Sequence, residues 1–121
     1  MKDPIVGIDL GTSNSVVAHA DEVGVVKVLP DDGGYKIHPS VVSFHPNGGV
    51  VVGAGAKQRK VIDPANTIYS VKRLIGRAVD SPEVEILKQR VPYQIKTGKD
   101  KLLQIATRGG DFAPPEISAI V

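Results

Sequence analysis

The 121 residues allow a single domain at most, and 41% hydrophobic with 23% charged residues is the composition of a globular rather than a disordered chain. Fifteen Lys and Arg against thirteen Asp and Glu leave a net charge of +2, too small to argue for nucleic acid or an anionic membrane as a partner. Cysteine is absent, which excludes disulfides and thiolate metal sites, and the three histidines show no metal-ligand spacing.

The first half of the chain is dominated by patterns typical of strands. Residues 5–10, 15–20 and 24–29 each predict a strand, and the four residues between the first two indicate an antiparallel hairpin. Residues 30–40 are rich in turn formers and are expected to form a loop. Two β-branched runs around Pro-Asn-Gly-Gly then predict a second hairpin over 40–55.

The segment 66–77 has the clearest helical pattern in the sequence. Asn66 is the expected N-cap and Gly76 the expected C-cap. Apolar residues recur at spacings of three and four, which predicts one buried stripe on a helix. The residues of this stripe are Ile68, Val71, Leu74 and Ile75.

Shorter elements are expected on both sides of this segment. Residues 56–62 suit one or two helical turns, which Pro64 would end, and 81–90 predict another short helix. Residues 92–109 predict a strand pair that turns at Gly98.

The last nine residues, "APPEISAIV", predict the beginning of a helix. Pro115 stands where a helix should start, and Ile117, Ile120 and Val121 begin an apolar stripe. A helix of about seven residues is marginal in water, and its stripe is expected to have little to pack against. We therefore expect this chain to be a fragment, cut inside a helix of a longer protein.

The turn in "DLGTSN" carries more chemistry than a hairpin requires. Gly11 would allow the positive φ that exposes successive backbone N–H groups, and Thr12, Ser13 and Asn14 add side-chain donors around them. Asp9 would repel a phosphate directly, so its useful role is to hold a bridging Mg²⁺. The residues predict an anion cradle, while an ordinary hairpin turn with a solvated Asp9 remains the alternative.

Other candidate sites are weaker. Lys72 and Arg73 lie on the predicted helix 66–77, where a charged pair is most often a solvated face. Gly53–Gln58 resembles a phosphate loop but fails both glycine-rich templates. The basic run 56–60 lacks the interleaved aromatic residues of a nucleic-acid surface, so no nucleic acid is expected as a partner.

The N-terminus and the apolar runs predict a cytoplasmic protein. Apolar runs span only about four or five residues, far short of the roughly 20 needed to cross a bilayer. Met1–Pro4 leads into a strand and lacks the apolar region of a signal peptide. We expect no membrane partner.

Three segments resemble the DnaK-type 70-kilodalton heat-shock chaperone family in order and spacing. "IVGIDLGTSNSVVA" is similar to the family's opening phosphate loop, which actin-like proteins and sugar kinases share in outline. "NTIYSVKRLIGR" is similar to a second signature that is highly specific to the chaperones, and "APPEISAIV" to a third. The resemblance covers essentially all of the chain.

This resemblance implies an α/β fold, namely the first lobe of an actin-like (ribonuclease H-like) ATPase that is β-rich with short helices. Residues 1–38 would begin the inner subdomain and carry the phosphate loop. Residues 39–113 would form the outer subdomain, and 114–121 would start a helix that returns to the inner one.

The resemblance also implies a parent protein that binds ATP and Mg²⁺ and hydrolyses ATP to ADP to control its grip on unfolded polypeptides. Its partners would be these clients and two cochaperones, a J-domain protein and a nucleotide exchange factor. Lys72 would be catalytic and position the attacking water, and Asp9 would lie near Mg²⁺, normally through water. The residues assigned to the phosphates are Gly11, Thr12, Ser13 and Asn14.

The sequence departs from the family pattern at two places, and the activity expected of the chain alone is limited. Ser13 replaces the family's second Thr but keeps a hydroxyl, and Lys36–His38 replace its usual Arg-Thr-Thr run. The chain alone is expected to be inactive and to bind ATP no more tightly than about 1 mM. The alternatives are an actin-like nucleotide-binding module that regulates a partner without chaperone activity, and an actin-like sugar kinase.

Overall fold

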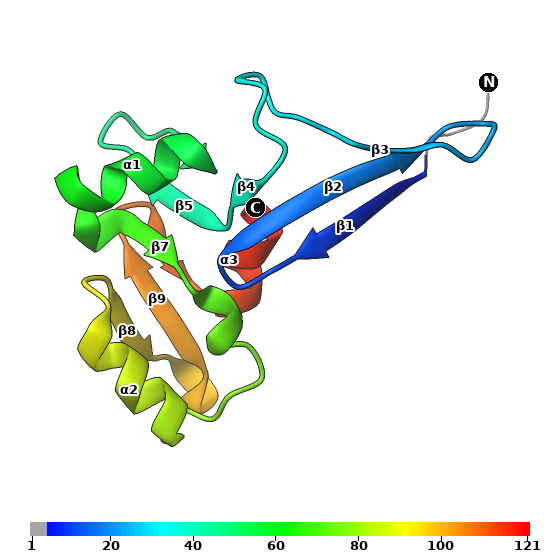
Figure 1. The fold of residues 1–121 in the computed structure, drawn as a ribbon. Helices are drawn as coiled ribbons and strands as arrows, with labels where there is room; N and C mark the ends of the chain where they lie inside the picture. Colours follow the sequence, from blue (N-terminus) through cyan, green and yellow to red (C-terminus); the bar gives the residue numbers. More distant parts are fainter. Residues whose placement is uncertain (1–4) are drawn as a thin grey trace.

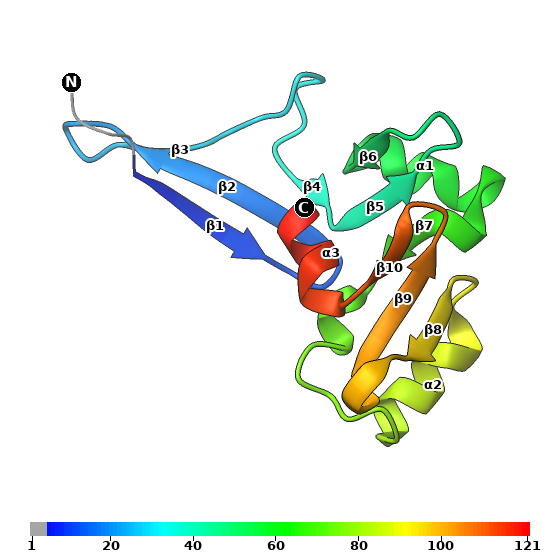
Figure 2. The same ribbon diagram turned by 180° about the vertical axis from the view of Figure 1, so that it is seen from behind.

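The computed structural model describes residues 5–121 and shows a β-rich chain with three short α-helices (Figures 1 and 2). Its strands form three small sheets in which every pairing is antiparallel. No helix in the described residues is long and apolar enough to cross a membrane.

The first sheet contains the predicted N-terminal hairpin. Figure 1 shows this hairpin extending away from the other two sheets, with α3 beside its turn. β4 pairs with β2 at the turn end, opposite Asn14 and Ser15, a pairing that the sequence pattern did not predict. The strands are β1 (Val6–Leu10), β2 (Asn14–Ala20), β3 (Val26–Val28) and β4 (His38–Pro39).

The second sheet confirms the hairpin predicted over 40–55 and adds a third strand. Its order is β6-β5-β7, so β5 lies in the middle. Residues Val41, Val42, Ser43 and Phe44 of β5 are all buried, because both neighbouring strands and a helix cover it. The elements are β5 (Val41–Phe44), β6 (Val50–Val52), α1 (Ala54–Ile62) and β7 (Thr67–Tyr69).

The third sheet has the order β10-β9-β8 and includes the predicted strand pair. Its outer strand β10 was not predicted from the sequence. Helices α2 and α3 precede and follow this sheet in the chain, and Figure 2 shows both beside it. The elements are α2 (Pro82–Arg90), β8 (Gln94–Thr97), β9 (Leu103–Thr107), β10 (Gly110–Phe112) and α3 (Pro114–Ile120). The 3₁₀ turns are η1 (Pro64–Asn66), η2 (Val71–Arg73) and η3 (Lys99–Lys101).

The prediction of a helix over 66–77 was wrong. β7 occupies Thr67–Tyr69, Ser70 takes a left-handed conformation with φ 58°, and the turn η2 follows. Thr67 and Ile68 are β-branched and fully buried beside β5, so sheet pairing outweighs the helical spacing. Ile75, the last member of the predicted stripe, is 38% exposed. Asn66 therefore caps no helix at this position.

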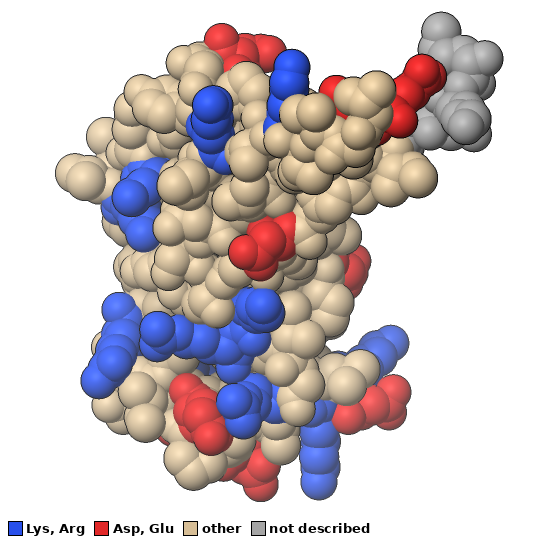
Figure 3. Space-filling view, turned by 45° about the vertical axis from the view of Figure 1, so that its right-hand side comes forward, with Lys and Arg blue, Asp and Glu red and all other residues tan. Residues whose placement is uncertain are grey.

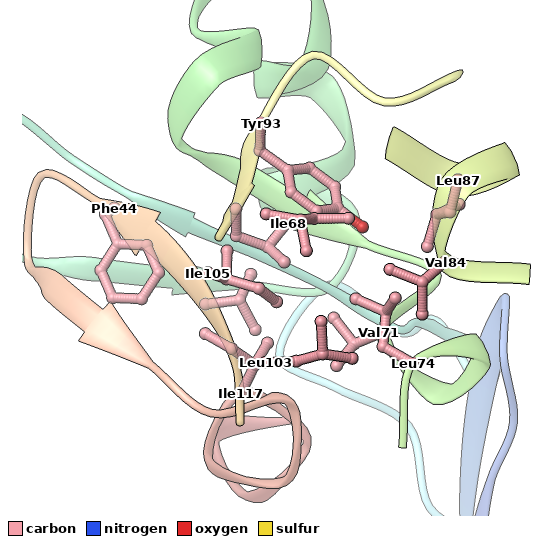
Figure 4. Close-up of a cluster of buried hydrophobic side chains, with 12 residues drawn as sticks. Phe44, Ile68, Val71, Leu74, Val84, Leu87, Tyr93, Leu103, Ile105 and Ile117 are labelled. Carbon is pink, nitrogen blue, oxygen red and sulfur yellow. The ribbon is translucent and has the colours of Figure 1, made fainter. Parts of the chain in front are cut away.

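One hydrophobic cluster joins the second and third sheets to the helices (Figure 4). Ile117 of α3 is 1% exposed within it, and Ile120 and Val121 pack against its edge. The expectation that this helix has little to pack against was therefore wrong. The buried members are Val42, Phe44, Ile68, Val71, Leu74, Val84, Leu87, Tyr93, Ile95, Leu103, Ile105 and Ile117.

A charged network beside this core connects the end of α1 to the β9–β10 turn. One carboxylate oxygen of Asp63 accepts hydrogen bonds from Arg108 at 2.6 Å and Arg59 at 3.2 Å, and the other accepts from Asn66 at 3.1 Å. The hydrogen bond from Asn66, followed by those from the two guanidinium groups, lowers the pKa of Asp63, although burial opposes the shift. Thr67 donates from its hydroxyl to the Asp63 carbonyl, which attaches β7 to the same network.

Candidate functional site

The turn between β1 and β2 is closed by a backbone hydrogen bond and held in place by hydrogen bonds from one serine. The Gly11 N–H donates to the Asn14 carbonyl at 3.0 Å. Ser40 donates from its N–H to the Ser13 carbonyl at 2.9 Å and from its hydroxyl to the Gly11 carbonyl at 2.9 Å. The Ser40 and Ser15 hydroxyls lie 2.8 Å apart. The sequence analysis missed Ser40, which follows the unpredicted strand β4 and fixes the shape of the turn.

Gly11 is required at this turn because the backbone passes very close to itself. A Cβ at position 11 would lie 2.3 Å from the Asn14 carbonyl oxygen, a distance that real Cβ atoms do not show. Gly11 is not among the described glycines with positive φ, so the reason predicted for it was wrong. Close approach, rather than a left-handed conformation, excludes a side chain here.

The tip of the turn presents hydrogen-bond donors that the fold does not use. The backbone N–H groups of Thr12 and Ser13 donate to no acceptor within residues 5–121, and neither do their hydroxyls or the Asn14 side chain. Ser13 and Asn14 are exposed, and Thr12 is half-buried. Adjacent free N–H groups beside hydroxyls form a concave site suited to an anion.

Lys72 reaches this turn from a distant part of the sequence. It lies on η2, and its Nζ donates to the Leu10 carbonyl at 2.9 Å across 62 positions of the chain. Lys72 and Ser40 border a small hollow with Gly11 and Thr12. The structure therefore places this ammonium group beside the predicted anion cradle, although η2 is not the helix on which the sequence placed it.

Arg73, the neighbour of Lys72, belongs to a different surface. It borders a separate hollow with Arg77, Arg90 and the α2 residue Ile86. Figure 3 shows Lys and Arg side chains gathered across the lower half of one face, with acidic side chains among them. The two adjacent basic residues thus point to different environments, and only Lys72 lines the hollow at the turn.

Asp9 is exposed on β1, opposite Val16 of β2 and two residues before Gly11. Among the described residues no three His, Asp or Glu side chains come close enough to hold a metal ion by themselves. Mg²⁺ in nucleotide sites commonly takes one or two carboxylates, with phosphate oxygens and water completing its coordination. A single carboxylate next to the predicted anion cradle fits this second kind of site.

The family model for "Hsp70 protein" matches residues 5–121, from the first described residue to the last. The chain belongs to the Hsp70 family. Among curated relatives, this Hsp70 chain is 44% identical over 121 residues to "Chaperone protein dnaK" of Cyanidium caldarium. It is 45% identical over 119 residues to the protein of the same name from Cyanidioschyzon merolae.

These alignments cover 98% and 97% of the Hsp70 chain but only 19% of each relative. The chain thus spans about a fifth of the length of the curated relatives it matches. The resemblance expected from the three segments is confirmed, since one match contains the turn, Lys72 and α3 together.

Proposed function

We propose that this chain is the N-terminal part of an ATP-hydrolysing Hsp70 chaperone, with the first lobe of an actin-like, ribonuclease H-like ATPase fold. Residues 1–38 begin the inner subdomain, 39–113 form the outer subdomain, and 114–121 start a helix that returns to the inner one. The observation that carries the proposal is the position of the Lys72 ammonium, 2.9 Å from the Leu10 carbonyl and beside a turn with unused donors.

Each residue of the proposed site has a chemical task in phosphoryl transfer. The N–H and hydroxyl groups of Thr12 and Ser13, with the Asn14 amide, donate hydrogen bonds to β- and γ-phosphate oxygens. Lys72 leaves the Leu10 carbonyl to orient the attacking water and to balance negative charge. These are positioning and electrostatic roles, which phosphoryl transfer needs more than covalent help.

Asp9 is the residue proposed to hold Mg²⁺, through a water molecule. When bound, Mg²⁺ neutralises charge on the phosphates. The cofactors of the parent protein are then ATP or ADP and Mg²⁺. Its partners are unfolded polypeptides, a J-domain protein and a nucleotide exchange factor. The parent protein would act in the cytoplasm as a stress-response chaperone that assists protein folding.

A chimera tests this proposal. In this chimera, residues 1–121 would replace the matched segment of the Cyanidium caldarium DnaK. The exchange is reasonable because the two segments are 44% identical over 98% of the chain. We expect the chimera to hydrolyse ATP and to support ATP-dependent refolding of a denatured enzyme, with the parental DnaK as control. A folded chimera that binds ATP without hydrolysing it would contradict the ATPase assignment. Hydrolysis without refolding would favour a regulatory module.

A further inference from the structure

Two lysines of α1 border the turn at a different hollow from the one that contains Lys72. Lys57 and Lys60 are three residues apart and therefore lie on one face of the helix. Together with Thr12, Ser13 and Asn14 they border a hollow of about 200 Å³ that is separate from the hollow containing Lys72.

The positive charge in this hollow has no acidic counterpart among residues 5–121. No carboxylate in residues 5–121 lies within 4 Å of the Lys57 or Lys60 ammonium, and no Asp or Glu borders the hollow. Lys60 is half-buried, with its Nζ 3.8 Å from the centre of the Tyr69 ring. Burial, and then the neighbouring Lys57 charge, lower the pKa of Lys60.

These features make the hollow unfavourable for a cation and favourable for an anion. Like charges three residues apart on a helix repel each other, and partial burial weakens the hydration of Lys60. The Tyr69 ring offsets part of this cost through a cation–π contact and holds the ammonium in place. An oxyanion in the hollow would balance both charges.

The remaining lining residues supply hydrogen-bond donors. Thr12 and Ser13, whose N–H and hydroxyl groups are unused, border the hollow, and so does Ser70, which follows β7. Ser70 has a left-handed backbone (φ 58°), which turns the chain between Tyr69 and Val71. The combination of two ammonium groups with several neutral donors suits a phosphate group.

We propose that Lys57 and Lys60 form a second phosphate-binding position at the 11–14 turn, in a hollow separate from that of Lys72. Its ligand is a phosphate group, either free inorganic phosphate or part of a nucleotide's phosphate chain. This inference extends the proposed function and rests on it, because both treat the turn as a phosphate loop.

Amide NMR of the 121-residue chain tests this position directly, with inorganic phosphate as the probe and chloride keeping the ionic strength constant. We expect saturable shifts at the amides of Thr12, Ser13 and Ser70. Lys60→Met should weaken phosphate binding by about tenfold, the effect of losing one charge-assisted hydrogen bond. Lys60→Arg should retain binding, and Lys99→Met should match the unmodified chain, since it removes the same charge from the exposed turn η3.

Further arms separate the two sources of phosphate and the two proposals. If ATP binds and Lys60→Met weakens it, the nucleotide supplies the group. If only inorganic phosphate binds and needs Lys60, the second position stands although the nucleotide-binding proposal fails for this chain. Equal weakening by Lys60→Met and Lys99→Met, or no saturable shift in the unmodified chain, would overturn the inference.

Discussion

Asp63 is the residue whose substitution should reveal most about the stability of this fold. Its carboxylate accepts hydrogen bonds from Arg108, Arg59 and Asn66 and thereby connects α1, η1 and the β9–β10 turn. Asp63→Asn keeps the shape of the side chain but removes its charge. The new NH₂ group either faces the two arginines, donor against donor, or loses the bond from Asn66.

The size of the effect follows from these contacts. Hydrogen bonds to charged groups contribute about 1.5–3 kcal/mol each, and exposed ion pairs about 0.2–1 kcal/mol. The Asp63 side chain is 15% exposed and Arg59 is 16% exposed, whereas Arg108 is 35% exposed. We therefore expect Asp63→Asn to lower the free energy of unfolding at pH 7 by about 2 kcal/mol.

Urea unfolding measured between pH 3 and pH 7 provides the assay for Asp63. Because the folded pKa of Asp63 is depressed, its contribution is complete above the unfolded value of about 3.9 and is lost as pH falls through the folded pKa. The difference between the two chains should therefore shrink below about pH 4.

The matched control is Asp111→Asn, which removes a carboxylate that is 42% exposed and paired with Lys96. It should cost about 0.5 kcal/mol. The reasoning is refuted if the two substitutions have equal effects, or if the Asp63→Asn difference does not change with pH.

Three further predictions concern the turn, the core and nucleotide affinity. Gly11→Ala should lower the free energy of unfolding by about 1–3 kcal/mol, because its Cβ would meet the Asn14 carbonyl; Gly7→Ala, with open space around it, is the control in the same urea assay. Ile68→Ala should lower the free energy of unfolding by about 2–5 kcal/mol, whereas Ile86→Ala, at a half-exposed position, should lower it by less than about 1 kcal/mol. Equal losses of stability would mean that the core is misassigned. Calorimetric titration of this chain with ATP should give a dissociation constant no tighter than about 1 mM, and a micromolar value would contradict the expectation that the chain alone binds ATP weakly.

The hairpins could be predicted because their signals are local. Continuous apolar and β-branched runs on either side of turn-forming residues specify β1–β2 and β5–β6 without reference to the rest of the chain. The strand pair turning near Gly98 was found in the same way. The short strand β10 has only three residues and no alternation of its own, so it becomes visible only through its pairing with β9.

The segment 66–77 could not be predicted because its decisive interaction is not local. A spacing of three between Ile68, Val71 and Leu74 suits a helix, but it also suits a strand followed by a 3₁₀ turn. The buried strand β5 pairs with Thr67 and Ile68, and this pairing favours the strand over the helix. Tertiary pairing therefore overrode the local pattern.

The candidate site was predicted in its residue types but not in its assembly. Gly11, Thr12, Ser13 and Asn14 are adjacent in the sequence, so their turn could be recognised directly. Lys72 came from the family resemblance, because a lysine next to Val71 has no local signal of function. Ser40, Lys57 and Lys60 reach the turn only through the packing of β4 and α1, which no spacing in the sequence reveals.

Lys72 is the most direct test of the proposed function. In the chimera with the Cyanidium caldarium DnaK, single-turnover hydrolysis of bound ATP would be compared between Lys72→Ala and the exposed control Lys99→Ala. We predict a loss of roughly 100-fold or more for Lys72→Ala, with ADP affinity changed by less than about threefold. Unchanged single-turnover hydrolysis in Lys72→Ala would contradict the assignment of this lysine, and of the turn beside it, to the ATPase site.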